Sequence, residues 1–175
     1  MKFERLASLC CENTVGNVYC DMDGVLADLE SFAHSVGVTP PISKKWDQMP
    51  LDTFLRLNPM PGSEKLVNYL KQNFPNFMVL TATPYPKPEF IAISNRGLVD
   101  KKTWMMQHFG IPPERVIVVK AGSVKKDYAV TDGVPNILVD DWEKNTVPFV
   151  QAGGKAVVYQ NADQAINDLE QLKNT

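Results

Sequence analysis

Cysteine and histidine are scarce in this 175-residue sequence, which holds three of the first and two of the second. The cysteines, Cys10, Cys11 and Cys20, form no C-x-x-C pair and show no zinc-ligand spacing. Adjacent cysteines rarely pair with each other, because disulfide geometry fits a dipeptide poorly. We therefore expect reduced thiols in a reducing compartment, and we expect Cys20 to be buried in a strand.

Long apolar segments and a strong charge of either sign are also missing. No apolar run approaches the roughly 20 residues of a membrane span, and residues 1–6 carry charge where a signal peptide needs apolar residues. The formal net charge of −2 gives no reason to expect an extended nucleic-acid or membrane surface. We expect a cytoplasmic protein, and nothing in the sequence bears on its oligomeric state.

Short apolar runs that alternate with helical patterns make up most of the chain. The runs have the composition of strands buried on both faces of a parallel sheet, and they cover 18–20, 77–80, 116–119, 137–139 and 156–159. Helical patterns are found at 1–14, from Ser63 as N-cap, at 101–108 before Gly110, and at 162–172. This alternation predicts an α/β fold, a doubly wound parallel sheet.

Residues 35–62 interrupt the alternation. They hold five of the thirteen prolines and no convincing strand. Long loops inside compact domains are uncommon unless they are functional, so we interpret the segment as a small helical cap insertion. The alternative is a long surface loop. The predicted division is a core of residues 1–34 and 63–175 with a cap of residues 35–62.

Polar residues follow three of the predicted strands. They are Asp21 and Asp23, then Thr81, then Asp140 and Asp141. Ligands of open parallel sheets bind beyond the carboxyl ends of the strands, so we expect these side chains to meet. Four clustered carboxylates would repel each other without a cation, and oxygen ligands favour a hard ion such as Mg²⁺. The alternative for each acidic pair is that it caps the following helix.

The same residues lie in motifs that resemble those of the haloacid dehalogenase superfamily. The stretch DMDGVLAD at 21–28 is similar to the first motif, LT at 80–81 to the second, and VDD at 139–141 to the fourth. Order and spacing agree over about residues 17–160. The resemblance therefore covers most of the chain and implies the Rossmann-like core of that superfamily.

The resemblance implies a Mg²⁺-dependent phosphatase that works through an aspartyl-phosphate. Asp21 would be the nucleophile. Asp23 would protonate the leaving oxygen and then activate water, and its backbone carbonyl would bind the metal. Thr81 would hydrogen-bond a phosphate oxygen. Asp140 and Asp141 would complete the metal shell, one of them through water, so that the predicted ligands are Asp21, Asp23, Asp140 and Asp141.

A lysine and a glycine are also implied beside the phosphate. The family's third motif is a lysine that balances the charge of nucleophile and phosphate, and Lys120, Lys125 and Lys126 all precede the fourth strand. The stretch KKDYA favours Lys125, with Lys126 next, although a solvated charge is the default interpretation of each. Gly24 would allow a tight turn. Lys101, in a helical pattern, could also reach a phosphate, but we interpret it as a solvated charge.

Within the superfamily the chain resembles the 5'(3')-deoxyribonucleotidases, through DMDGVLAD, MPG at 60–62 and Trp104 before HFG at 108–110. This resemblance implies a nucleoside monophosphate whose base stacks on aromatic residues of the cap. Leu29 departs from the pattern, since that group usually has an aromatic residue there. Trp46 or Phe54 could supply the stacking face instead, and the alternative for Trp46 is a place in the core of the cap. The alternatives are a phosphatase of nucleic-acid ends and a non-catalytic phosphate-binding module.

Overall fold

A five-stranded parallel sheet forms the centre of the molecule in the computed structural model, which describes residues 16–173. In the order β3-β2-β1-β6-β7, its strands are β3 (Val116–Lys120), β2 (Phe77–Thr83), β1 (Val18–Cys20), β6 (Ile137–Asp140) and β7 (Lys155–Val158). The predicted doubly wound α/β fold is confirmed. The predicted helix at 1–14, with Cys10 and Cys11, lies outside the described residues.

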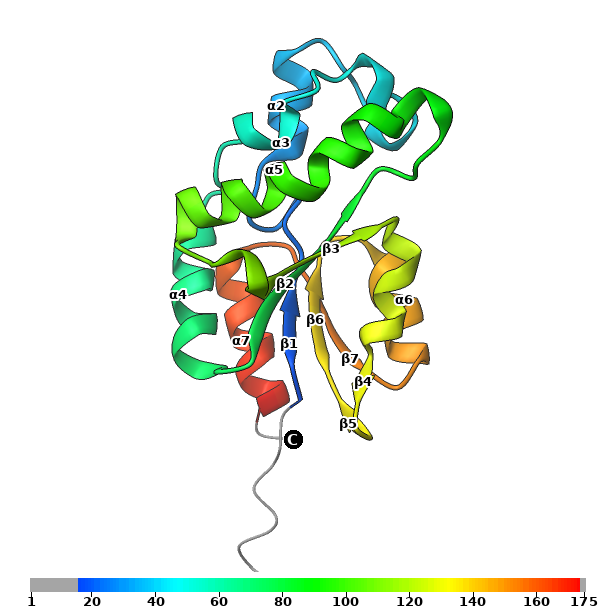
Figure 1. The fold of residues 1–175 in the computed structure, drawn as a ribbon. Helices are drawn as coiled ribbons and strands as arrows, with labels where there is room; N and C mark the ends of the chain where they lie inside the picture. The colour runs from blue at the N-terminus through cyan, green and yellow to red at the C-terminus, as the bar shows by residue number, and fades with distance from the viewer. Residues whose placement is uncertain (1–15, 174–175) are drawn as a thin grey trace, which may run out of the picture.

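Helices cover both faces of this sheet (Figure 1). One face carries α4 (Ser63–Asn73), α7 (Ala162–Lys173) and the end of α5 (Ile91–Phe109), and the other carries α6 (Glu143–Gln151) and η5 (Gly122–Tyr128). Successive strand residues point to opposite faces. Val18 and Cys20 accordingly enter the larger hydrophobic cluster and Tyr19 enters the smaller one. Cys20 is buried, as predicted.

Two elements extend further than the sequence patterns indicated. Strand β2 continues past Thr81 to Thr83, because residues 81–83 pair in register with β3. Helix α5 begins at Ile91, ten residues before the predicted 101–108. Its buried stripe includes the polar residues Ser94, Asp100 and Lys101, so its first half shows no apolar periodicity. Gly110 ends the helix in a left-handed conformation, as predicted.

Helix α4 begins as predicted, except for its cap. The N-cap is Gly62 in a left-handed conformation with φ of 82°, and Ser63 is the first helical residue. Two connecting elements complete the core, the turn η4 (Pro113–Arg115) and the antiparallel pair β4 (Val130–Thr131) and β5 (Val134–Pro135). None of the helices between residues 16 and 173 combines the length and apolar character that a bilayer crossing requires.

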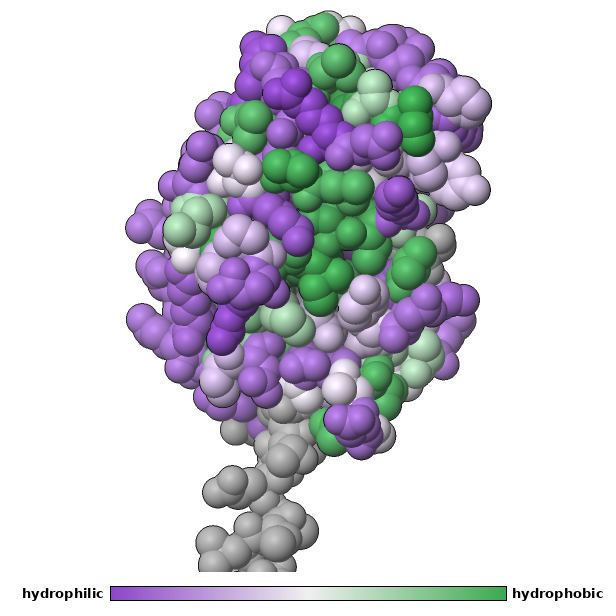
Figure 2. All heavy atoms as spheres, viewed as in Figure 1, coloured by the Kyte–Doolittle hydropathy of each residue, from purple (hydrophilic) through white to green (hydrophobic). Residues whose placement is uncertain are grey.

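A layer of short helices lies over the carboxyl ends of the strands (Figure 1). It contains α2 (Leu29–Ser35), η1 (Ile42–Lys44), η2 (Trp46–Gln48) and α3 (Thr53–Arg56). Helix α3 packs on α5, and η2 packs on η3 (Pro88–Phe90), so segments distant in sequence form this layer together. The cap bounds of 35–62 stay a prediction. Figure 2, viewed from the same side as Figure 1, shows hydrophobic surface gathered at mid-height of the molecule.

Candidate active site

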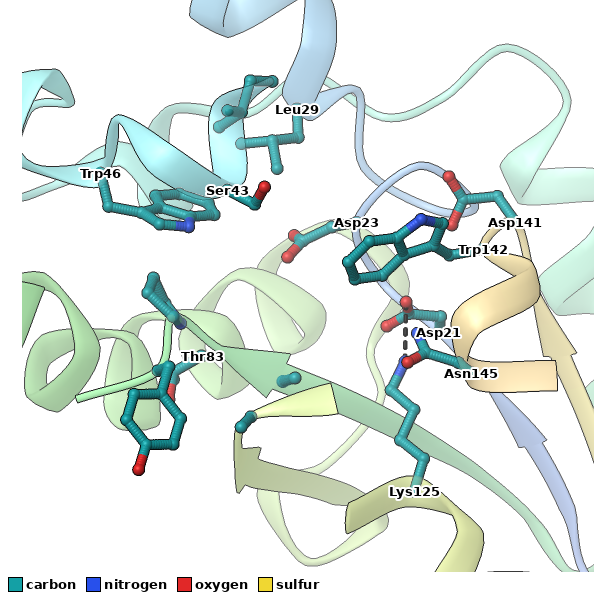
Figure 3. A pocket seen from close by; sticks show the side chains of 15 residues that line it. Asp21, Asp23, Leu29, Ser43, Trp46, Thr83, Lys125, Asp141, Trp142 and Asn145 are labelled. Atoms are coloured by element: carbon teal, nitrogen blue, oxygen red, sulfur yellow. Dashed lines mark ion pairs between the residues drawn. The ribbon is translucent and has the colours of Figure 1, made fainter. Parts of the chain in front are cut away.

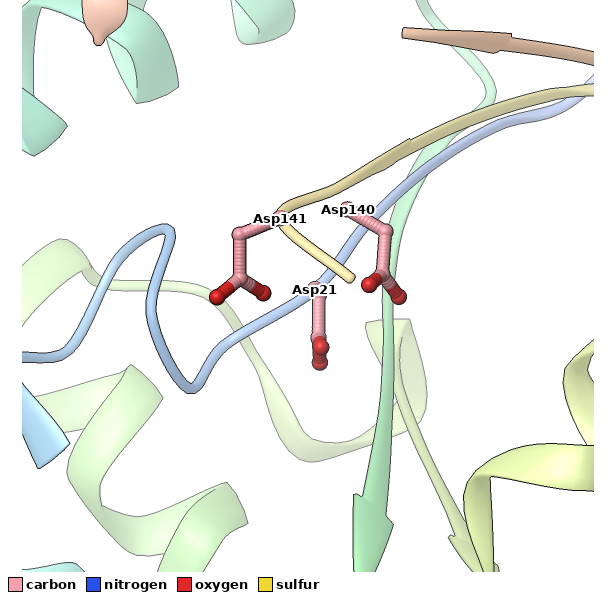
Figure 4. Close-up of side chains that lie close together, drawn as sticks. All are labelled: Asp21, Asp140 and Asp141. Atoms are coloured by element: carbon pink, nitrogen blue, oxygen red, sulfur yellow. The ribbon is translucent and has the colours of Figure 1, made fainter. Parts of the chain in front are cut away.

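Three carboxylates meet beyond the ends of β1 and β6. Asp21 follows β1 and Asp140 ends β6, and the two strands pair in parallel with Cys20 opposite Val139. One carboxylate oxygen from each of Asp21, Asp140 and Asp141 lies within 4.8 Å of the others (Figure 4). The carboxylate of Asp23 is outside this cluster. Its predicted contribution to a metal, through the backbone carbonyl, stays a prediction.

The electrostatics of this cluster fit a hard divalent cation. The pKa of Asp140 is raised to about 6, first by burial and next by Asp21, while Lys125 opposes the shift. Asp141 is more exposed to solvent. Its pKa is raised in the same direction, by desolvation of its carboxyl group and by Asp21 and Asp140. Carboxylates that repel each other and offer only oxygen are the donors that Mg²⁺ prefers.

Lys125 is the lysine that reaches this cluster. It lies on η5 and is buried, with Nζ 2.7 Å from Asp21 Oδ2 and 2.6 Å from Asp140 Oδ2. Burial alone would lower the pKa of Lys125, but Asp21 and Asp140 outweigh burial and raise it. Lys120 and Lys126 are exposed. Of the three predicted lysines, therefore, only Lys125 contacts the carboxylates.

Hydrogen bonds hold Asp21 and Asp140 in place. The backbone N–H of Met22 donates to Asp21 Oδ1 at 2.7 Å, so Lys125 and this bond engage both oxygens of Asp21. The amide of Asn145 donates to both oxygens of Asp140, at 3.1 and 3.0 Å. Sequence reasoning missed Asn145. Its contact depends on how α6 packs beside β6, which no local pattern indicates.

Gly24 makes the tight turn that the sequence predicted. Its φ is 80°, and a Cβ atom at this position would overlap the carboxylate of Asp141. Only glycine adopts this backbone conformation without strain and also leaves room for the side chain of Asp141. The structure therefore places Gly24 against the acidic cluster rather than on the lining of the neighbouring cavity.

A second lysine pairs with Asp23. Lys101 of α5 is fully buried, with Nζ 2.5 Å from Asp23 Oδ2 and 3.0 Å from Thr81 Oγ1. The interpretation of Lys101 as a solvated charge is wrong, because the cap layer covers α5 at this point. Burial raises the pKa of Asp23, and Lys101 opposes the shift while Asp21 adds to it.

The cavity beside these charges has a volume of about 460 Å³. Its charged lining consists of Asp21, Asp23, Lys125 and Asp141 (Figure 3). Its apolar and aromatic lining includes Leu29, Ile42, Trp46, Tyr85 and Trp142. The cavity thus joins a polar end, suited to a charged group, to a largely apolar remainder.

Some of the residues predicted to contact the substrate line this cavity, and others do not. Trp46 lines it, whereas Phe54 is buried behind Trp46 with its ring centroid 5.7 Å away. Thr83 lines the cavity and Thr81 does not. Thr81 is fully buried, and its hydroxyl accepts the hydrogen bond from Lys101. The phosphate contact of Thr81 stays a prediction. Sequence reasoning missed Trp142, although it directly follows the Asp140-Asp141 pair.

Comparison with known proteins establishes the fold. No family model and no curated protein matches the sequence. A haloacid dehalogenase-like hydrolase of Streptococcus pneumoniae is 13% identical over 93% of this chain and 99% of that chain, with a TM-score of 0.51. The haloacid dehalogenase domain of the effector Lem4 of Legionella pneumophila is 9% identical over 90% and 95%, with a TM-score of 0.47. The likeness to the Streptococcus pneumoniae hydrolase shows that the chain has a haloacid dehalogenase-like fold, as the motifs implied.

Proposed function

We propose that the protein is a Mg²⁺-dependent phosphomonoesterase that works through an aspartyl-phosphate on Asp21. The observation that carries this proposal is the setting of Asp21. Its carboxylate lies in the acidic cluster, 2.7 Å from the Lys125 ammonium group, and lines the cavity. A carboxylate held by two hydrogen bonds and facing a cavity is suited to attack phosphorus.

The proposed reaction has two steps, and Asp23 acts in both. An oxygen of Asp21 forms a bond to phosphorus as the ester P–O bond breaks, and Asp23 gives its proton to the leaving oxygen. Water then attacks phosphorus, Asp23 takes up the proton of that water, and Asp21 is released. Lys125 balances the negative charge of Asp21 and the phosphate throughout. Bound by Asp21, Asp140 and Asp141, Mg²⁺ would supply further positive charge against the phosphate.

The substrate we propose is a nucleoside monophosphate. Support comes from Trp46 and Trp142, which face the cavity with Asp23 between them (Figure 3). Aromatic side chains stack on any of the nucleic-acid bases, because every base has a flat aromatic face. A cavity of about 460 Å³ is in the range of small-molecule sites. We propose that the protein acts in the cytoplasm and that it has no extended surface for binding nucleic acids.

The experiment measures phosphate release from p-nitrophenyl phosphate and from a panel of nucleoside monophosphates in the presence of Mg²⁺. We expect turnover that a chelator abolishes and that Asp21→Asn lowers on the order of 10⁴-fold or more, as removal of other covalent nucleophiles does. Full activity in Asp21→Asn, or in the presence of chelator, would contradict the mechanism.

The same assay separates the alternatives. An oligonucleotide with a terminal phosphate should be turned over more slowly than the corresponding mononucleotide. Faster turnover of the oligonucleotide would indicate a phosphatase of nucleic-acid ends. Binding of Mg²⁺ and phosphate without turnover of any substrate would indicate a non-catalytic phosphate-binding module.

A further inference from the structure

Lys101 is a fully buried lysine whose contacts are few and well defined. Its Nζ contacts Asp23 Oδ2 at 2.5 Å and Thr81 Oγ1 at 3.0 Å, and it lies 4.3 Å from the ring centroid of Phe54. A buried ammonium group is costly unless an opposite charge and hydrogen-bond acceptors surround it. The contacts supply one carboxylate, one hydroxyl and one aromatic face. They restrict the position of the ammonium group from three directions.

The two lysines of the site serve different carboxylates. Lys125, from η5, pairs with Asp21 and Asp140, whereas Lys101, from α5, pairs with Asp23. The elements that carry them approach the strand ends separately, and Phe54 of α3 brings the cap layer against Lys101. Lys101 therefore does not duplicate the charge balance that Lys125 provides to Asp21.

The two carboxylate oxygens of Asp23 differ in their hydrogen bonding. Oδ2 is bound to Lys101, whereas Oδ1 is buried and has no hydrogen-bond partner, a position that no other described side-chain oxygen or nitrogen shares. A buried oxygen without a partner is destabilising. Lys101 is therefore the one hydrogen-bond partner that the described side chains offer to this carboxylate.

We propose that Lys101 is a positioning residue for Asp23, an inference that rests on the proposed phosphatase function. Through Oδ2 it holds the carboxyl group at the cavity wall, where this group can exchange a proton with the leaving oxygen. Thr81 and Phe54 in turn fix the ammonium group of Lys101. Lys101 acts through Asp23 and itself contacts neither the phosphate nor the leaving group.

A positioning role for Lys101 predicts that the effect of its loss depends on the leaving group, whereas a purely structural role does not. A poor leaving group needs protonation as its bond to phosphorus breaks, whereas a good leaving group departs without it. Loss of Lys101 should therefore slow the first step, the transfer of phosphorus to Asp21, selectively for poor leaving groups. If Lys101 served only to stabilise the fold, its loss would slow this step alike for good and poor leaving groups.

The test compares Lys101→Met with wild type on p-nitrophenyl phosphate, which has a good leaving group, and on an alkyl phosphate, which has a poor one. We expect kcat/KM, which covers the transfer of phosphorus to Asp21 but not the later water step, to fall by roughly 10²-fold for the alkyl phosphate, the scale of general acid catalysis. For the aryl phosphate kcat/KM should fall far less. Lys102→Met removes the neighbouring lysine charge of α5 and should leave both rates unchanged.

A double variant shows whether Lys101 acts through Asp23. On p-nitrophenyl phosphate, Lys101→Met should cause no further loss of kcat in an Asp23→Asn background, since coupled residues are non-additive. The double variant also removes both buried charges together. It thus remains measurable if Lys101→Met alone fails to fold, and Phe54→Leu, which loosens Lys101, should then show the leaving-group pattern in weaker form.

Each result has one interpretation. Selective loss of kcat/KM with the poor leaving group, together with no further loss of kcat on p-nitrophenyl phosphate in the Asp23→Asn background, supports the proposal. Equal losses of kcat/KM on both substrates, or additive losses of kcat in the double variant, overturn the positioning role while leaving the phosphatase function intact. Failure of the wild-type enzyme to turn over either substrate overturns both the proposed function and this inference.

Discussion

Gly24 and Asp141 occupy adjoining space, and this contact ties the backbone of the first motif to the acidic cluster. The φ of Gly24 is 80°, and a Cβ atom there would overlap the Asp141 carboxylate. An alanine at this position is disfavoured by its backbone conformation, by about 1–2 kcal/mol, and in addition displaces Asp141. The side chain that is displaced is one that we propose as a metal ligand.

Gly24→Ala should therefore raise the Mg²⁺ concentration needed for half-maximal phosphatase activity. The matched control is Gly133→Ala, because Gly133 also has a φ of 80° but has open space where the Cβ atom would lie. Both variants should lose stability, as measured by urea unfolding. Only Gly24→Ala should alter the Mg²⁺ titration, and an equal change in Gly133→Ala would show that backbone strain alone is responsible.

Replacement of Trp142 tests the proposed substrate. It lines the cavity and is 48% exposed, so its replacement should have little effect on stability. Trp142→Leu should raise KM for a nucleoside monophosphate roughly tenfold, since base stacking on an aromatic side chain is worth that much. KM for a small alkyl phosphate should not change. An equal rise for both substrates would argue against stacking.

At the scale of elements, α5 connects the cap layer to the sheet. Trp104 of α5 is fully buried, and its indole N–H donates to the backbone carbonyl of Leu57 at 2.8 Å. Leu57 follows α3, so this bond joins the two helices at the point where α3 ends. The aromatic ring of Trp104 also packs against Phe109 near the end of the helix.

Trp104→Phe should lower the free energy of unfolding by about 1–3 kcal/mol, because it leaves the Leu57 carbonyl buried without its donor. The measurement is urea unfolding. Trp142→Phe is the control, since it makes the same chemical change at an exposed position and should be close to neutral. Similar losses in the two variants would show that the Leu57 bond contributes little.

Helix α5 also shows where sequence reasoning reaches its limit. The strands were predictable because buried parallel strands are short, continuous apolar runs, and the carboxylates after them follow from strand direction. The first half of α5 was not, since Ser94 and Lys101 interrupt its buried stripe. Lys101 and Asn145 contact the site from helices, and the direction in which a helix faces is set by tertiary packing.

For the whole molecule, the acidic cluster is a source of instability that a cation would relieve. The pKa of Asp140 is about 6 in the folded protein against 3.8 for an unperturbed carboxyl group. The fold therefore favours the protonated carboxyl group. The stability that this group contributes is full below about pH 4, and it is lost as the pH rises through about 6.

Without Mg²⁺, the melting temperature of wild type relative to Asp140→Asn should therefore fall between pH 4 and pH 7. The comparison isolates the cluster, because asparagine does not ionise and the titrating groups outside the cluster are shared. Mg²⁺ requires ionised carboxylates, so the stabilisation it gives wild type should be larger at pH 8 than at pH 5. Mg²⁺ should stabilise Asp140→Asn much less. A stabilisation independent of pH, or equal in the two proteins, would place the bound ion away from Asp140.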